Sequence, residues 1–309
     1  MEYKTLMENW RRFVQNEEKS PDYDPDGQQK EKLENLLPME YESFVDTLKR
    51  ELEKEGDPKF QRFLNMGIEK FDGDGADDVI SVDREASIPV KDLAPTQNQI
   101  GIKDSLGWLA ENKPDQFGEI AELGPGGEAD IGGRIITANG KYVVDGHHRW
   151  SMVYFINPEA NIPTYNFNVP GLKDGAGALK LAQLAIAAVD GEIPKVNADA
   201  ETDIYGKTKG NIDKIKEILI QPGIINDTVI KSLAKAWKSS EMPNPSREQI
   251  IDRLAENAKS LHDKTVKSAS KGPTRSYMPQ PAGTEEKPTE PIEKIDVLDK
   301  GIANWNPKA

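Results

Sequence analysis

The spacing of apolar residues predicts that the first quarter of the chain is helical. In the first twenty residues the apolar side chains Leu6, Trp10, Phe13 and Val14 fall at positions i, i+4, i+7 and i+8, which is the spacing of one helix face. The polar stretch SPDYDPDGQQ interrupts this pattern. A second apolar series then runs from about Gln29 to Glu55, and Pro38 divides it in two. We therefore expect residues 1–78 to form a helical segment that packs on the rest of the chain.

From about residue 79 the pattern changes to short β-branched runs. A strand over Ile88 to Val90 leads into a proline-containing loop, and IKDSLGWLAENKPDQF predicts a short helix that Pro114 closes. In RIITANGKYVVDG, two β-branched runs flank Asn139-Gly140. This pair favours a β-hairpin, because both central residues of a type I′ turn need a positive φ.

The second hairpin strand, YVVD, runs directly into a helix, because Trp150, Val153 and Tyr154 have helical spacing. A further strand is expected in IPTYNFNVPG, and DGAGALKLAQLAIAAVDG predicts an alanine-rich helix. Together these elements indicate an α+β fold in which residues 79–195 form a small core with a mixed sheet.

The last third of the chain predicts helices followed by a tail. Three helices are expected in GNIDKIKEILIQPG, INDTVIKSLAKAW and SREQIIDRLAENAKSL, and the third begins with a capping box from Ser246 to Gln249. Residues 196–263 are therefore expected to form a C-terminal helical segment. Residues 264–309 are rich in Pro, Gly, Ser, Thr and Glu, a composition typical of a disordered tail.

Composition narrows the classes of function. The formal net charge of −13 argues against broad attachment to nucleic acid or to an anionic membrane, although a local basic patch stays open. The absence of cysteine excludes disulfides, thiolate metal sites and thiol catalysis. Charges interrupt every apolar run, so neither a signal peptide nor a membrane span is expected. We expect a soluble protein of the cytoplasm.

The turn DGHHR, residues 145–149, carries the candidate chemistry. A helix that starts here presents free backbone N–H groups and the positive end of its dipole, and Gly146 permits close approach of a ligand. Arg149 suits paired hydrogen bonds to phosphate oxygens, and His147 and His148 add donors. The alternative is that Asp145 is an ordinary N-cap and that the histidines and the arginine form a solvated first turn.

Metal binding at this turn is restricted by geometry. Adjacent residues of a helix point about 100° apart, so His147 and His148 do not readily chelate one ion. Asp145 can instead hold a nucleotide-bound magnesium ion, which needs few protein ligands. A further acidic stretch, FDGDGADDVISVD, has part of the EF-hand spacing but lacks the glycine at the sixth position, so we interpret it as an acidic loop.

A glycine-rich segment, GPGGEA, covers residues 124–129. It has the spacing of a dinucleotide-binding loop without the preceding strand and following helix that such a loop needs. We interpret it as a flap over the site, from which Glu128 or Asp130 can supply an acid.

The order of these motifs resembles the ParB/sulfiredoxin superfamily. IPVKDLAPTQ, a helix, ITANGKYVVDGHHRWSMVYF and NIPTYNFNV follow one another as in that superfamily, over about a third of the chain. The resemblance implies that the turn binds the phosphates of ATP, ADP or CTP with Mg²⁺. It implies phosphate-binding roles for Gly146, His148, Arg149 and, more loosely, Lys103.

The resemblance also implies candidate catalytic residues, and this chain departs from the superfamily pattern at two positions. Asp145 matches an acid of kinase-like members, and His147 stands where sulfiredoxins have their reactive cysteine, so sulfinic-acid repair is excluded. Kinase-like members have an acid in the loop that here reads PTQNQ, where Gln97 and Gln99 cannot act as bases. Asp145 and His147, with an acid of the flap, remain the candidate catalytic residues.

Three functions stay open. The favoured hypothesis is a nucleotide-binding protein with NTP hydrolysis or phosphoryl transfer. The second is a non-catalytic structural or interaction protein that contacts another protein through its terminal helices or tail. The opening LMENWRRFV resembles proteins of tailed phages, which implies the host cytoplasm or a virion. The third is a metal-dependent ParB-like nuclease.

Overall fold

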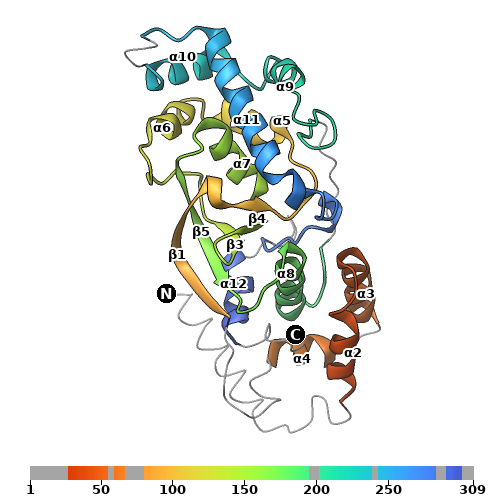
Figure 1. Ribbon diagram of the computed structural model, residues 1–309. Coiled ribbons are helices and arrows are strands. Elements are labelled where there is room, and N and C mark those ends of the chain that lie inside the picture. Colours follow the sequence, from red (N-terminus) through yellow and green to blue (C-terminus); the bar gives the residue numbers. More distant parts are fainter. Residues whose placement is uncertain are drawn as a thin grey trace.

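The computed structural model describes residues 27–54, 59–66, 80–194, 202–238, 243–282 and 290–300. The predicted helix around Trp10, the EF-hand-like stretch up to residue 79 and the chain end after residue 300 lie outside these residues. The fold is α+β, as predicted from the sequence, with one mixed sheet covered by helices on both faces (Figure 1).

The sheet has five strands in the order β1-β5-β3-β4-β2. Pairing is antiparallel between β1 and β5 and between β3 and β4, and parallel between β5 and β3 and between β4 and β2. The strands are β1 (Ser81–Pro89), β2 (Ala94–Pro95), β3 (Ile135–Ala138), β4 (Tyr142–Asp145) and β5 (Asn161–Asn168). β1 is longer than the predicted strand, because residues 81–83 and 86–87 also pair with β5.

The predicted hairpin is confirmed between β3 and β4. Asn139 has φ 51° and Gly140 has φ 60°, and the amide of Lys141 donates to the carbonyl oxygen of Ala138 at 3.0 Å. These are the features of a type I′ turn. The hairpin fixes where β4 ends, and therefore where the candidate turn begins.

Helices cover the two faces of the sheet as two groups (Figure 1). One face carries α5 (Ile102–Asn112), α6 (Gln116–Glu122), α7 (His147–Ile156), α9 (Ile212–Leu219), α10 (Asp227–Ala236) and α11 (Arg247–Ala269), with η2 (Val90–Asp92). The other carries α2 (Gln28–Leu36), α3 (Tyr41–Glu53), α4 (Lys59–Met66), α8 (Gly175–Asp190), α12 (Pro291–Asp296) and η4 (Val297–Lys300).

Strand alternation divides the buried side chains between two cores. Ile135 and Val143 belong to the core under α7, while their chain neighbours Ile136 and Val144 belong to the core under α8. Successive strand residues point to opposite faces, so a strand that is covered on both sides is mostly apolar along its whole length. The described helices of the predicted N-terminal and C-terminal helical segments thus belong to different cores, on opposite faces of the sheet.

The C-terminal segment differs from the predicted disordered tail. α11 continues to Ala269, η3 (Arg275–Tyr277) follows, and α12 and η4 pack on the core under α8. Buried apolar side chains of the described part include Met278, Ile295, Val297 and Leu298. An average over the composition of residues 264–309 does not reveal these few apolar residues. Their burial stabilises the contact of the segment with the core under α8.

Candidate functional site

The turn between β4 and α7 depends on Gly146. This residue has φ 89°, and a Cβ added to it would lie 2.4 Å from Cγ2 of Ile135. Only glycine combines a left-handed backbone with such a close approach. The carbonyl oxygen of Gly146 accepts the first helical hydrogen bond from the amide of Trp150 at 3.0 Å. Strand β4 therefore turns into α7 within one residue.

No side chain caps the start of α7. The N-cap position is held by Gly146 rather than by Asp145, and no side chain accepts a hydrogen bond there. The first amide groups of a helix have no acceptor within the helix. The alternative expected from the sequence, in which Asp145 is an ordinary N-cap, is therefore not what the structure shows. The amides and the positive end of the dipole stay available to an anion.

His147 points into the protein. Its side chain is buried, its Nε2 accepts a hydrogen bond from the amide of Thr96 at 3.2 Å, and the hydroxyl of Thr96 donates to the carbonyl oxygen of Val143 at 2.6 Å. Burial first, and then the charges of His148 and Arg275, lower the pKa of His147 to about 3. A neutral imidazole with this contact positions the turn against the loop after β2. That role differs from the predicted catalytic role.

His148 lines a cavity of about 300 Å³ between α5 and α7. Burial, followed by the charge of Arg275, lowers its pKa to about 4, while Asp104 acts in the opposite direction. The ring is therefore neutral at pH 7. An anion in contact with it would favour protonation, because an opposite charge stabilises the imidazolium form.

Arg149 is held by two contacts beside the turn. Its Nη2 lies 3.6 Å from Oδ2 of Asp145, and its Nη1 donates to the carbonyl oxygen of Arg134 at 3.2 Å. About a third of the Arg149 side chain is exposed, and it lines the cavity next to His148. Partial burial raises the pKa of Asp145, whereas Arg149 and the amide of Gly146 oppose that rise. Asp145 thus orients the arginine.

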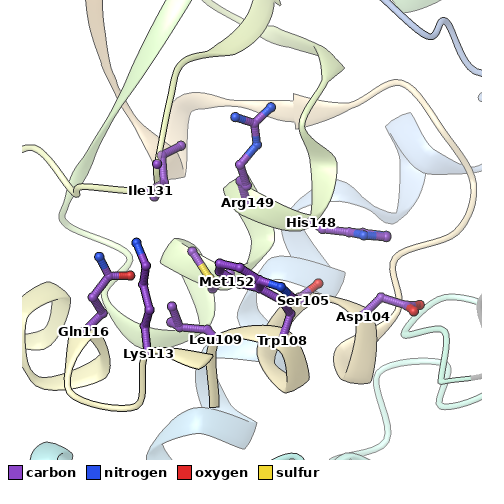
Figure 2. A pocket seen from close by; sticks show the side chains of 11 residues that line it. Asp104, Ser105, Trp108, Leu109, Lys113, Gln116, Ile131, His148, Arg149 and Met152 are labelled. Carbon is purple, nitrogen blue, oxygen red and sulfur yellow. The ribbon is translucent and has the colours of Figure 1, made fainter. Parts of the chain in front are cut away.

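The cavity combines basic, acidic and aromatic side chains (Figure 2). In that view Lys113 points from α5 toward Ile131, and the ring of His148 extends to the side on which Asp104 lies. The residues of the lining used below are Asp104, Trp108, Lys113, Ile131, His148 and Arg149. Of the predicted site residues, His148 and Arg149 line the cavity, whereas Asp145 and His147 are not part of its lining.

Trp108 and Lys113 are cavity residues that the sequence reasoning missed. Trp108 is 60% exposed, while the buried stripe of α5 is formed by Ile102, Ser105, Leu106, Leu109 and Ala110. A large aromatic residue off the buried stripe of an amphipathic helix is the signal that would have identified it. Lys103, which the resemblance suggested, is exposed at the start of the same helix and is not part of the cavity lining.

The glycine-rich segment is fixed to the sheet rather than free as a flap. The amide of Ala129 donates to the carbonyl oxygen of Asn161 at 2.9 Å, and the amide of Asn161 donates to the carbonyl oxygen of Gly127 at 2.8 Å. Glu128 and Asp130 are exposed and do not line the cavity, although Ile131 does. The segment therefore does not line the cavity, and it brings neither acid into it.

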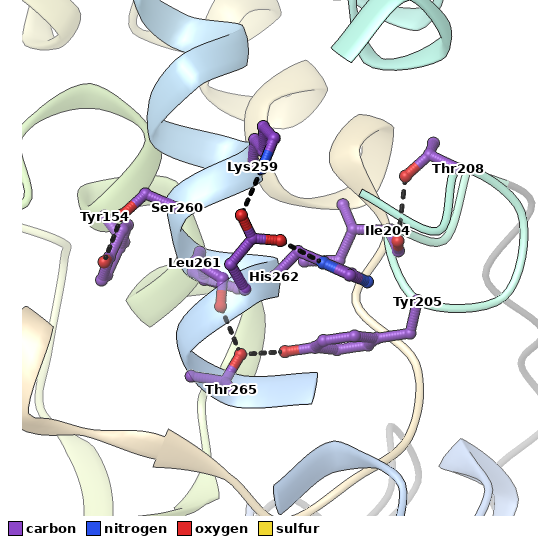
Figure 3. A network of polar contacts seen from close by, with 10 residues as sticks. Tyr154, Ile204, Tyr205, Thr208, Lys259, Ser260, Leu261, His262 and Thr265 are labelled. Atoms are coloured by element: carbon purple, nitrogen blue, oxygen red, sulfur yellow. Dashed lines mark hydrogen bonds and ion pairs between the residues drawn. The ribbon is translucent and has the colours of Figure 1, made fainter. Parts of the chain in front are cut away.

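The third histidine of the chain belongs to a separate network on α11 (Figure 3). Nδ1 of His262 lies 3.0 Å from Oδ1 of Asp263, and a Cβ on Gly210 would lie 2.4 Å from the His262 ring. The hydroxyl groups of Tyr205 and Thr265 lie 2.6 Å apart. These contacts bind the loop before α9 to α11, so we interpret them as structural.

Two absences were found among the described residues. No group of three His, Cys, Asp or Glu side chains is placed to hold a metal ion within that part of the chain. Among the described helices, none combines the length and the apolar character that a membrane span requires.

Comparison with known proteins adds no assignment. The chain matches no protein-family model, no curated protein sequence and no solved structure.

Proposed function

We propose that the protein binds a nucleotide, with ATP, ADP and CTP as the candidate ligands, by gripping its phosphates at the start of α7. The observation that carries this proposal is that Gly146 holds the N-cap position of α7, so no side chain caps the helix. Two residues of the first helical turn, His148 and Arg149, line a cavity. An uncapped helix N-terminus beside an arginine is a favourable site for phosphate. The resemblance to the ParB/sulfiredoxin superfamily implies the same class of ligand.

The cationic side chains that line the cavity support binding of an anionic ligand, although the protein as a whole is strongly acidic. The whole chain has a formal net charge of −13, yet Lys113 and Arg149 line the cavity together with the neutral but protonatable His148. Arg149 is already held by Asp145 and by the carbonyl oxygen of Arg134, so little side-chain entropy is lost when it meets a phosphate.

Trp108 favours a nucleotide over free phosphate. Its largely exposed indole lies in the lining of the same cavity as Lys113 and Arg149. Stacking of a base on an aromatic side chain contributes about 1–3 kcal/mol and tolerates different bases. A ligand with both a phosphate group and a flat ring therefore uses more of this cavity than an inorganic anion.

The proposal is for binding, with turnover as a separate question. Nε2 of His147 is occupied by the amide of Thr96, and Asp145 is paired with Arg149, so neither acts as an unoccupied base next to the cavity. Magnesium fits this site as an ion carried by the phosphates, because such an ion needs few protein ligands. Hydrolysis or phosphoryl transfer is then tested by measuring phosphate release from the bound nucleotide.

A thermal-unfolding screen tests the proposal. The intact protein is heated with ATP, ADP, CTP, the matching nucleosides or inorganic phosphate, each with and without magnesium. A specific nucleotide at 100 times its Kd stabilises the folded protein by about 2.7 kcal/mol. We expect a nucleotide to raise the Tm more than its nucleoside or phosphate does. Equal Tm values with and without every nucleotide would contradict the proposal and favour the non-catalytic interaction protein.

A further inference from the structure

The chain that follows α11 passes beside the candidate site as a strap, defined as residues 271–278. It begins with a tight turn, in which the amide of Gly272 donates to the carbonyl oxygen of Ala269 at 2.9 Å. It then passes the loop after β2, where the amide of Asn98 donates to the carbonyl oxygen of Pro273 at 3.0 Å. A segment more than a hundred residues away in sequence thus packs on the loop that contacts the turn.

The contact between strap and loop is unusually close at Gly272. A Cβ on this residue would lie 2.3 Å from the carbonyl oxygen of Thr96 and 2.8 Å from Cα of Gln97. The neighbouring amide of Thr96 donates to His147. A single residue, Thr96, therefore links the strap to the DGHHR turn.

The strap brings a second arginine to the edge of the cavity. Nη1 of Arg275 lies 3.7 Å from Oδ2 of Asp104, a cavity residue on the same side as the ring of His148 (Figure 2). The positive charge of Arg275 lowers the pKa of both His147 and His148, so it lies within electrostatic reach of both imidazoles. The Arg275 side chain is 24% exposed and can meet a ligand.

The far end of the strap is anchored on the opposite face of the sheet. The carbonyl oxygen of Tyr277 accepts hydrogen bonds from the hydroxyl of Tyr41 at 2.8 Å and from Nε2 of Gln183 at 3.1 Å, and Met278 is buried. Arg275 is therefore held between two fixed points, Gly272 and Tyr277. This arrangement sets the position of its backbone before any ligand arrives.

We propose that Arg275 is a second phosphate-binding arginine of the site, delivered by the strap, and that Asp104 holds it until a polyphosphate takes the place of that carboxylate. This inference rests on the proposed nucleotide binding at α7. His148 then lies beside Arg149 on its own helix and beside the charge of Arg275 from the strap. Two arginines on separate elements suit a ligand with at least two phosphate groups better than one with a single phosphate.

The test uses the full-length protein and calorimetric titration with magnesium ATP, magnesium CTP and inorganic triphosphate. Arg275→Ala removes the proposed contact, and we expect the Kd of the bound polyphosphate to rise about tenfold, the loss typical of a charge-assisted hydrogen bond. Lys271→Ala is the matched control, because it removes an exposed cation of the same strap. Its Kd should stay within about twofold of the wild-type value, as expected for a charge without a direct contact.

Asp104→Asn distinguishes a ligand contact from a structural ion pair. If Arg275 only fastens the strap through Asp104, loss of either partner weakens binding equally. If Arg275 binds the ligand, Asp104→Asn removes a competing carboxylate, and the Kd falls. Exposed ion pairs contribute little to folding, so both variants are expected to fold, which circular dichroism verifies.

The outcomes separate this inference from the proposed function. A higher Kd in Arg275→Ala together with a lower Kd in Asp104→Asn supports the strap arginine. Wild-type affinity in Arg275→Ala, with binding lost in Arg149→Ala, overturns the strap arginine and leaves nucleotide binding intact. Equal weakening in Arg275→Ala and Asp104→Asn also overturns it. A wild-type protein that binds none of the three probes overturns the strap arginine, and overturns nucleotide binding as well if magnesium ADP also fails to bind.

Discussion

Single residues of the DGHHR turn have different tasks, although the sequence presents them side by side. The five residues could be predicted to form a strand-to-helix turn, because the hairpin before them and the helical spacing after them are both local patterns. Which histidine faces the cavity could not be predicted. His147 is buried because the loop after β2 supplies Thr96 as its partner, and that contact depends on residues fifty positions away.

The conformation of Gly146 gives the first prediction. Gly146→Ala should reduce the free energy of unfolding by about 2–5 kcal/mol, since it adds a left-handed backbone penalty to a clash with Ile135. Gly126→Ala is the control, because Gly126 also has a positive φ of 79° but has no heavy atom within 4 Å of an added Cβ. Urea unfolding should show a loss of only about 1–2 kcal/mol for the control. Equal losses would contradict the close approach to Ile135.

The lowered pKa of His148 gives a pH prediction. Its pKa is about 4 in the folded protein against an ordinary value of 6.5, so the folded state binds fewer protons than the unfolded state between these values. Stability should therefore fall as the pH falls from 6.5 toward 4. A bound phosphate raises the pKa again, so nucleotide binding at pH 6 should take up protons.

Calorimetry in buffers of different ionisation enthalpy measures this proton uptake. His148→Asn is the control, because the titration of the nucleotide itself is the same in both proteins. Uptake that is unchanged in His148→Asn would show that His148 does not contact the anion.

Elements, rather than residues, decide which cations reach the site. A short helix closed by Pro114 was predicted in IKDSLGWLAENKPDQF, and the structure contains it as α5. The resemblance suggested Lys103 as the phosphate-binding lysine of this helix. The structure instead places Lys113, the residue that directly follows α5, in the cavity lining. The reason is the orientation of α5 against α7, which is set by packing in the shared core and is not contained in the periodicity of either helix.

The two lysines make a matched pair for a third prediction. Lys113→Ala should raise the Kd for a nucleotide about three- to tenfold, because it removes a cation from the cavity lining. Lys103→Ala should leave the Kd within about twofold, since an exposed charge outside the cavity is screened by solvent. Fluorescence or calorimetric titration measures both values. A larger effect of Lys103→Ala would place the phosphates at the other end of α5.

At the scale of the whole molecule, the fold class could be predicted from the sequence, whereas the packing of the described part of residues 264–309 on the core could not. The alternation of strand and helix patterns is sufficient for an α+β fold. The burial of Ile295 and Leu298 depends on a surface that α8 and the sheet present only after folding. A composition average over residues 264–309 does not register so few anchoring side chains.

Leu298 tests whether the C-terminal segment is part of the folded molecule. Leu298→Ala should lower the free energy of unfolding by about 2–5 kcal/mol, because the side chain is completely buried. Val266→Ala, at a position that is 36% exposed on α11, should change it by less than about 0.5 kcal/mol. Denaturant unfolding with an unchanged stability in Leu298→Ala would indicate a disordered tail.

The most direct test of the account is a calorimetric titration of the wild-type protein and of Arg149→Ala with ATP, ADP and CTP in the presence of magnesium. We expect saturable binding of a nucleotide by the wild-type protein and a loss of affinity of at least about tenfold in Arg149→Ala, because the variant removes the arginine beside the uncapped start of α7. Equal affinities of the two proteins, or no binding of any nucleotide by the wild-type protein, would contradict it.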